Sequence, residues 1–529
     1  MCINVQQIAY LHPDKEVLFE NISFSVEEGQ KIALIGNNGS GKSTLLRVIN
    51  NDLHRSSGEI HLKSVPYYIP QHFGQYDDMS IAQALNIDKK MDALSSILGG
   101  EASFDNFTQL DDDWGIEERA LAALSFWGLS YLALEQKLSN LSGGEKTRVF
   151  LSGIIIHEPS IILLDEPTNH LDYSSREKLY GFIQSSHTTI IIVSHDRTLL
   201  NLLNYTYELG QDGIVFYAGN YDFYKNQKEI EMDALHAKLE DNEKELRLAR
   251  KVAKEVAERK QKHEVRGKKN NLKKGVGKMA MDTLQDKAEK SSSKLKNVHL
   301  DKMEKILGNI TEIRAALPDK RLMKTDFTPS SLHEGKILAT AKDINYNYGS
   351  QLLWRENLNF QIKSGERIAI RGMNGSGKST LIHLIIGQLT VTEGILSKSN
   401  FKSVFLDQDY SIINNNLTIM EQVQLFSQDL HEHEIKIILN RFLFSHDTWH
   451  KSCDKLSGGE KMKLALCCLM VSANTPDMFI LDEPTNNIDI RNVDVLTNTI
   501  RDYRGTVLVV SHDEYFINQI GIDYSINLL

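Results

Sequence analysis

GNNGSGKST occupies residues 36–44, and GMNGSGKST occupies residues 372–380. Each stretch follows a short apolar run, GQKIALIG or GERIAIRG, and precedes a helical pattern. A glycine loop between a buried strand and a helix presents backbone N–H groups at the helix N-terminus, where a phosphate binds. One match could arise by chance, but two in the same context predict two phosphate-binding loops.

Three further motifs recur in the same order. LSGGEK begins at residues 141 and 456, LLDEPTNHLD at 163 returns as ILDEPTNNID at 480, and VSHD ends at 196 and 513. The chain is therefore an internal duplication. The first half carries about 21 extra residues within 71–138, because its first two motifs lie farther apart. A tolerated surface loop and a small added subdomain both explain this insertion.

The length, composition and net charge of the chain exclude several classes of protein. The chain has 529 residues, 41% of them hydrophobic and 25% charged, and a net charge of -10. No run approaches the ~18 apolar residues of a membrane span, and no secretory signal is visible, so we expect a cytoplasmic protein without a membrane partner. Four scattered cysteines without a CxxC pair argue against zinc and iron–sulfur sites. They are Cys2, Cys453, Cys467 and Cys468.

Apolar runs that end in polar residues predict the fold. SIILLDE, DMFILDE, TTIIIVSH and TVLVVSH are typical of parallel strands with function at their carboxyl ends. Helical patterns alternate with them, so each half is predicted to be α/β. We expect P-loop ATPase domains at 1–222 and 331–529, the insertion at about 72–138, and a helical linker at 223–330.

The linker differs from both halves in composition. Apolar residues at helical spacing flank a cluster of Gly267, Gly275 and Gly277, which predicts two helices of about 40 residues, each about 60 Å long, folded back as an antiparallel hairpin. Residues 259–296 hold thirteen Lys or Arg against four Asp or Glu, a net charge of +9 that leaves -19 for the remainder. A solvated helical face is the usual fate of charge runs, but the one-sided excess favours contact with RNA.

The repeated motifs predict the chemistry of nucleotide hydrolysis. Lys42 and Lys378 should reach the β- and γ-phosphates of a nucleotide. Mg²⁺ should be held by the hydroxyls of Ser43 and Ser379 and by the carboxylates of Asp165 and Asp482. Glu166 and Glu483 should orient or deprotonate the attacking water. LSGGE alone predicts either an anion site or an ordinary helix N-cap.

Together and in this order, the motifs resemble the ATP-binding-cassette (ABC) superfamily over both halves. The resemblance implies two ATP molecules sandwiched head to tail between the halves. One site would combine Lys42, Asp165, Glu166 and His195 with Ser457 and Gly459, and the other Lys378, Asp482, Glu483 and His512 with Ser142 and Gly144. It also implies that Gln71 and Gln408 sense Mg²⁺ and water, and that Tyr348 stacks on adenine, where the first half has His12 with Tyr10 nearby.

The predicted nucleotide-binding residues of the two loops form one set. They are Gly36, Asn37, Asn38, Gly39, Ser40, Gly41, Lys42, Ser43 and Thr44, with Gly372, Met373, Asn374, Gly375, Ser376, Gly377, Lys378, Ser379 and Thr380. The predicted catalytic residues are Glu166, Glu483, His195 and His512. Neither half lacks its glutamate, signature serine or histidine, so we expect both sites to hydrolyse ATP.

Within the superfamily, the chain resembles the ABC-F family, whose members are tandem cassettes that mostly act on ribosomes. The features that match are DEPTN in both halves, the insertion, which resembles the family's arm, and the helical linker. The resemblance implies an ATP-gated clamp at the ribosomal E site, whose linker tip touches the P-site tRNA. Its role would be that of a translation factor or of an antibiotic-resistance protein. Lys268, Lys269, Lys273 and Lys274 would then bind RNA. A fused importer ATPase that binds a membrane permease is the alternative.

Overall fold

The structure is a computed structural model. It describes residues 2–101, 103–210, 213–273, 297, 300–315, 317, 332–349, 351–427, 430–472, 476–486 and 488–528. The chain divides into two compact units, and the larger one combines Met1–Asp222 with Leu322–Leu529. The smaller unit is Phe223–Arg321, the segment between the two halves.

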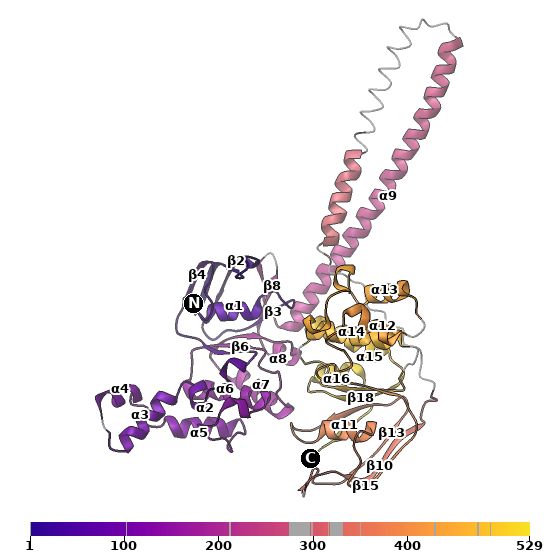
Figure 1. Cartoon of the computed structure of the whole chain (residues 1–529). Coiled ribbons are helices and arrows are strands. Elements are labelled where there is room, and N and C mark those ends of the chain that lie inside the picture. Colours follow the sequence, from indigo (N-terminus) through magenta and orange to yellow (C-terminus); the bar gives the residue numbers. More distant parts are fainter. Residues whose placement is uncertain are drawn as a thin grey trace. The chain divides into compact units, whose positions relative to one another are not determined.

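The first half contains two sheets (Figure 1). Strands β1 (Ile3–Leu11), β2 (Val17–Val26) and β4 (Ser57–Leu62) form an antiparallel sheet in the order β2-β1-β4. The second sheet has the order β5-β6-β7-β3-β8-β9 and is parallel except at β9. Its strands are β3 (Lys31–Gly36), β5 (Tyr67–Ile69), β6 (Ile161–Asp165), β7 (Thr189–Val193), β8 (Tyr205–Gly210) and β9 (Gly213–Tyr217).

The second half repeats this arrangement. An antiparallel sheet β13-β10-β15 accompanies a parallel sheet in the order β16-β17-β18-β14-β19. The strands of these two sheets are β10 (Ile337–Asn345), β13 (Leu358–Lys363), β14 (Arg367–Arg371), β15 (Glu393–Lys398), β16 (Ser403–Leu406), β17 (Met478–Asp482), β18 (Thr506–Val510) and β19 (Tyr524–Asn527). Strands β11 (Asn347–Tyr348) and β12 (Gln351–Leu352) pair with each other in a separate two-stranded sheet. The predicted parallel strands are confirmed, and both phosphate loops leave central strands.

Helices surround the sheets of both halves. In the first half they are α1 (Lys42–Ile49), α2 (Ile81–Ala84), α3 (Asp88–Leu98), α4 (Phe104–Leu110), α5 (Ile116–Phe126), α6 (Gly143–His157), α7 (Tyr173–Ser185) and α8 (Arg197–Asn201). In the second half they are α11 (Lys378–Ile386), α12 (Ile419–Phe426), α13 (Glu432–Arg441), α14 (Gly458–Val471), α15 (Ile490–Asp502) and α16 (Glu514–Ile520).

The insertion in the first half is helical. Four helices, α2 to α5, lie between β5 and α6, whereas α12 and α13 occupy the corresponding stretch of the second half. Asp113 connects α3 and α5, because its carboxylate accepts hydrogen bonds from Lys90 of α3 at 3.0 Å and from Arg119 of α5 at 2.8 Å. The insertion therefore has internal packing and ion pairs of its own, unlike an irregular surface loop.

The smaller unit contains a helical hairpin (Figure 1). Helix α9 (Tyr221–Lys273) has 53 residues, about 80 Å at 1.5 Å per residue, and a second helical segment covers residues 300–315. Leu246 packs against Ile306 and Ile310, and Lys302 pairs with Glu245 at 3.0 Å. The predicted hairpin is thus confirmed.

The length of the first hairpin helix differs from the expectation of about 40 residues. We expected the chain to fold back at the glycine cluster, but α9 passes through Gly267 and ends at Lys273. A single glycine costs a helix about 1 kcal/mol relative to alanine, which helix-forming neighbours can offset. Gly275 and Gly277 lie outside the described residues, as do most of the predicted tip and residues 318–331.

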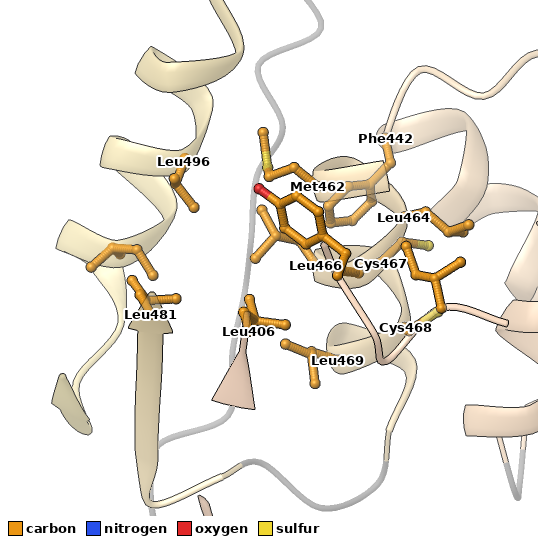
Figure 2. Close-up of a cluster of buried hydrophobic side chains, with 14 of the residues drawn as sticks. Leu406, Phe442, Met462, Leu464, Leu466, Cys467, Cys468, Leu469, Leu481 and Leu496 are labelled. Atoms are coloured by element: carbon orange, nitrogen blue, oxygen red, sulfur yellow. The ribbon is translucent and has the colours of Figure 1, made fainter. Parts of the chain in front are cut away.

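The core of the second half fixes the helix that carries the second LSGGE motif. Side chains of α14 converge with Leu406 of β16, Leu481 of β17 and Phe442 in one buried cluster (Figure 2). Met462, Leu466 and Cys467 of α14 are fully buried there. Because this helix is apolar along most of its length, burial sets the position of its N-terminus.

Candidate functional site

Both phosphate loops end in a glycine that starts a helix. Gly41 precedes α1 with φ 92°, and Gly377 precedes α11 with φ 86°, in the left-handed region that favours glycine. A Cβ on Gly41 would also lie 2.9 Å from side-chain carbons of Leu18 and Phe19. No side chain of the described residues caps either helix, so their N-terminal N–H groups remain available to an anion.

Each loop lysine folds back over its own glycine loop. Lys42 donates to the carbonyl oxygens of Gly36 at 2.9 Å and Asn37 at 3.1 Å. Lys378 does the same to Gly372 at 2.9 Å and Met373 at 3.2 Å. Burial lowers the pKa of both lysines, which nearby carboxylates oppose. A phosphate group could replace these carbonyl acceptors.

A serine and an aspartate from distant parts of the sequence meet beside each loop. The Ser43 hydroxyl donates to Asp165 Oδ1 at 3.0 Å, and the Ser379 hydroxyl donates to Asp482 Oδ2 at 2.9 Å. Burial raises the pKa of both carboxyls. Hydroxyl and carboxylate oxygens are the hard ligands that Mg²⁺ prefers. The serine and the aspartate of each half therefore fit one magnesium ion.

The next residue in each half is a glutamate with an unusual backbone, buried in the first half and largely buried in the second. Glu166 has φ 51° and Glu483 has φ 49°, a conformation that costs a non-glycine residue energy and clusters at functional sites. His195 donates its backbone N–H to Glu166 Oε2 at 3.2 Å, and its Nε2 lies 3.3 Å from Oε1. In the second half, His512 Nε2 lies 3.3 Å from Glu483 Oε1.

Burial shifts the pKa of both residues in each glutamate–histidine pair. It raises the pKa of Glu166 to about 8 and that of Glu483 to about 7, with Asp165 adding to the rise at Glu166. Burial, together with the nearby loop lysines, lowers the pKa of His195 and of His512 to about 3. Both imidazoles are therefore neutral, and each glutamate is poised to exchange a proton near neutral pH.

The LSGGE motifs begin helices, which both interpretations of the motif require. Ser142 caps α6 and Ser457 caps α14, each in a capping box with the glutamate three residues later. Glu145 Oε2 accepts from the Ser142 backbone N–H at 2.8 Å. This role of Glu145 and Glu460 was not predicted, although the S-x-x-E spacing is its signal.

Contacts between the two halves lie near these motifs. Asn374 of the second phosphate loop donates to the His170 carbonyl at 3.1 Å. A Cβ on Gly144 would lie 3.5 Å from the Asn374 side-chain nitrogen. The first LSGGE motif thus lies close to the second phosphate loop, and the full head-to-tail pairing with Ser142, Ser457 and Gly459 stays a prediction.

The remaining predicted residues lie on other elements of the chain. Gln71 follows β5 and is half-buried, whereas Gln408 follows β16 and is exposed. The exposed Tyr348 is hydrogen bonded to Thr380 at 3.2 Å, and Tyr10 contacts His12 edge-on at 5.7 Å between ring centroids. Lys268, Lys269 and Lys273 lie in the last turns of α9, and Lys274 lies outside the described residues.

Two residues make contacts near the sites that the motifs do not predict. The Tyr68 phenol donates to Asp165 Oδ2 at 3.3 Å. Arg176 of α7 is buried and donates to the carbonyl oxygens of Leu171 and of His512, in the other half, both at 3.1 Å. When the two DEPTN motifs are aligned, Val493 of the second half takes the position of Arg176. The second half therefore has no arginine there to make the equivalent contact with the first half.

Comparisons with known proteins agree with this geometry. The family described as ABC transporter matches residues 19–169 and 355–486. The "Putative ATP-binding protein YdiF" of Bacillus subtilis is 32% identical over 96% of this chain and 77% of its own. The "Energy-dependent translational throttle protein EttA" of Escherichia coli is 29% identical over 98% of this chain and 91% of its own. "ABC transporter F family member 5" of Arabidopsis thaliana is 29% identical over 95% and 72%.

A solved structure shares the fold over nearly the whole chain. It is the archaeal ribosome recycling factor aABCE1 in complex with the ribosomal stalk protein aP1, with a TM-score of 0.61 and 18% identity over 99% of this chain and 87% of that one. Among the described residues, no helix combines the length and apolar character needed to cross a bilayer. The chain belongs to the ABC family, in its ABC-F branch, and is an ATPase with two cassettes.

Proposed function

We propose that this ATPase is an ATP-gated clamp that acts on the ribosome in the cytoplasm. ATP closes the two cassettes, the closed form binds at the E site with the linker tip beside the P-site tRNA, and hydrolysis releases it. A ligand drives such a switch only through its different affinity for the closed and open forms. The name of EttA, a translational throttle protein, supports a role in translation.

The observation that carries the ribosomal role is the long helix of the linker. Helix α9 has 53 residues and leads into a segment with a net charge of +9, in a chain whose total is -10. An acidic body is repelled by RNA, so the basic far end of a helix about 80 Å long is suited to reach it.

Hydrolysis would rest on residues that each cassette brings together. Lys42 and Lys378 would bind the phosphates of ATP, and the Ser43–Asp165 and Ser379–Asp482 pairs would hold Mg²⁺, which neutralises phosphate charge when bound. Glu166 and Glu483 would accept a proton from the attacking water, while His195 and His512 hold the glutamates in place. Ser142, Gly144, Ser457 and Gly459 would complete the opposite sites.

The clamp is tested by the double substitution Glu166→Gln and Glu483→Gln. Glutamine keeps the shape of each side chain but cannot take a proton, so ATP should still bind while hydrolysis falls by at least about 100-fold. We expect the variant to co-sediment with ribosomes in ATP and to arrest translation in cells. The matched control, Lys42→Ala with Lys378→Ala, should bind neither ATP nor ribosomes.

Two results would contradict the clamp. One is a glutamine variant that hydrolyses ATP at the wild-type rate. The other is a variant that never enriches on ribosomes but co-purifies with membranes, as an importer ATPase would.

The proposed clamp fits two roles, a translation factor and an antibiotic-resistance protein. Expression in a drug-susceptible host separates them. Increased tolerance to drugs of the large-subunit catalytic centre or tunnel entrance would assign resistance. Unchanged tolerance to every such class would assign the translation factor role.

A further inference from the structure

The two proposed Mg²⁺ sites differ by one hydroxyl group. In the first cassette, both oxygens of the Asp165 carboxylate accept hydrogen bonds, Oδ1 from Ser43 at 3.0 Å and Oδ2 from Tyr68 at 3.3 Å. Tyr68 lies on β5, three residues before Gln71. The carboxylate is therefore held from two sides by groups on different elements of the same cassette.

Strand register identifies the equivalent residue of the second cassette. Tyr68 lies opposite Leu163 on β6, two residues before Asp165. Phe405 lies opposite Ile480 on β17, two residues before Asp482. Both strand pairs are parallel, so Phe405 occupies the place of Tyr68.

The phenylalanine cannot make the bond that the tyrosine makes. Its ring packs edge-on against His383, with 5.8 Å between centroids. Asp482 accepts from Ser379 at 2.9 Å, and a phenyl ring offers no O–H donor. The second carboxylate thus lacks one of the two restraints found in the first.

Burial explains why the first carboxylate needs this restraint. Asp165 is only 1% exposed, whereas Asp482 is partly exposed. A buried carboxylate without enough hydrogen bonds is costly, and a hydrogen bond to a charged group stabilises it more than a neutral bond does. A carboxylate already fixed in one orientation also loses less conformational freedom when a ligand binds.

We propose that Tyr68 is a positioning residue that holds Asp165 ready for the metal, so that the first site binds Mg²⁺–nucleotide at a lower Mg²⁺ concentration than the second. The phenol acts through Asp165 and does not itself touch the nucleotide. This inference rests on the proposed Mg²⁺ sites but not on the ribosomal role, and it makes the two ATP sites non-equivalent.

The experiment isolates one site at a time in the full chain. Lys378→Ala silences the second site, and the Mg²⁺ dependence of binding is then measured by fluorescence of a labelled non-hydrolysable ATP analogue, with and without Tyr68→Phe. We expect Tyr68→Phe to raise the half-saturating Mg²⁺ concentration about three- to tenfold, the effect of losing one hydrogen bond. The maximal binding signal should hold, because the substitution removes only the hydroxyl, while the melting temperature should fall by no more than a few degrees, because one hydrogen bond to a buried carboxylate is lost.

The reciprocal variant is the matched control. With the first site silenced by Lys42→Ala, Phe405→Tyr should lower the half-saturating Mg²⁺ concentration of the second site. An unchanged Mg²⁺ dependence in Tyr68→Phe would overturn the inference alone. A Lys378→Ala parent that binds the analogue without any need for Mg²⁺ would overturn the proposed metal site and this inference with it.

Discussion

At the scale of single residues, the two adjacent glycines of the first signature have different surroundings. A Cβ on Gly144 would lie 2.5 Å from the backbone carbonyl oxygen of His170, whereas a Cβ on Gly143 would meet only the His170 ring, at 3.2 Å. A ring can rotate away, but the carbonyl belongs to the backbone that connects Glu166 to α7, so it cannot move without shifting the site. Gly144 therefore allows α6 to approach that segment closely.

This difference predicts that Gly144→Ala is more damaging than Gly143→Ala. Overpacking against a fixed backbone costs about 1–3 kcal/mol, so Gly144→Ala should lower the melting temperature by a few degrees and reduce ATP hydrolysis. Gly143→Ala should leave both almost unchanged. Differential scanning calorimetry and a phosphate-release assay would check this, and equal effects of the two variants would show that the close approach is unimportant.

Most residues of the sites could be predicted because their chemistry is encoded in short motifs. Lys42, Ser43 and Asp165 stand in stretches whose spacing fixes strand, loop and helix. Tyr68 and Arg176 could not be predicted, because their partners lie 97 and 336 residues away in the chain. Nothing local distinguishes a tyrosine that reaches a carboxylate from one that packs in a core.

At the scale of secondary-structure elements, α9 shows where propensity is a weak guide. Gly267 was read as the beginning of the turn, yet the helix continues to Lys273. The insertion was equally open to a loop or a subdomain, and only packing could decide. Its short helices gain little stability from their own propensity, and α3 and α5 are held by the contacts of Asp113 with Lys90 and Arg119.

The proposed role of the linker predicts how its tip should respond to salt. Changing Lys268, Lys269, Lys273 and Lys274 to Gln removes four charges far along the chain from either ATP site. Basal ATP hydrolysis should hold, while ribosome affinity should fall and its salt dependence should flatten by about 0.7–0.9 log units per lost phosphate contact. Co-sedimentation over a range of KCl concentrations would measure both.

The matched control removes the same number of charges from the earlier turns of the same helix. Lys238, Lys244, Lys251 and Lys254 are exposed on α9, and their change to Gln should leave the salt slope intact. If the two sets of substitutions gave the same slope, the tip would be an ordinary solvated face.

At the scale of the whole molecule, a buried arginine links the two cassettes within one compact unit. Arg197 of α8 is 2% exposed and donates to Asp494 of α15 at 2.6 Å and to the Ile490 carbonyl at 3.2 Å. Its guanidinium also lies over the ring of Tyr515, 4.8 Å from the centroid. The equivalent position after the second VSHD is Glu514, which pairs with Arg371 of its own cassette at 3.2 Å.

These two ion pairs predict different coupling energies. Arg197→Met and Asp494→Ala should each destabilise the chain, the second more, because it leaves the buried Arg197 guanidinium without its carboxylate partner. The double variant should lose less than the sum. Because Asp494 is 41% exposed on its side chain, we expect a coupling of about 1–2 kcal/mol.

Arg371→Met with Glu514→Ala is the matched cycle, and since both of its side chains are over a third exposed, its coupling should stay below about 1 kcal/mol. Shifts in the melting temperature of the full chain, followed by calorimetry, give both cycles. Additive losses at Arg197 and Asp494 would mean that this contact does not hold the cassettes together, and that their association rests on the remaining contacts, such as Arg176 with His512.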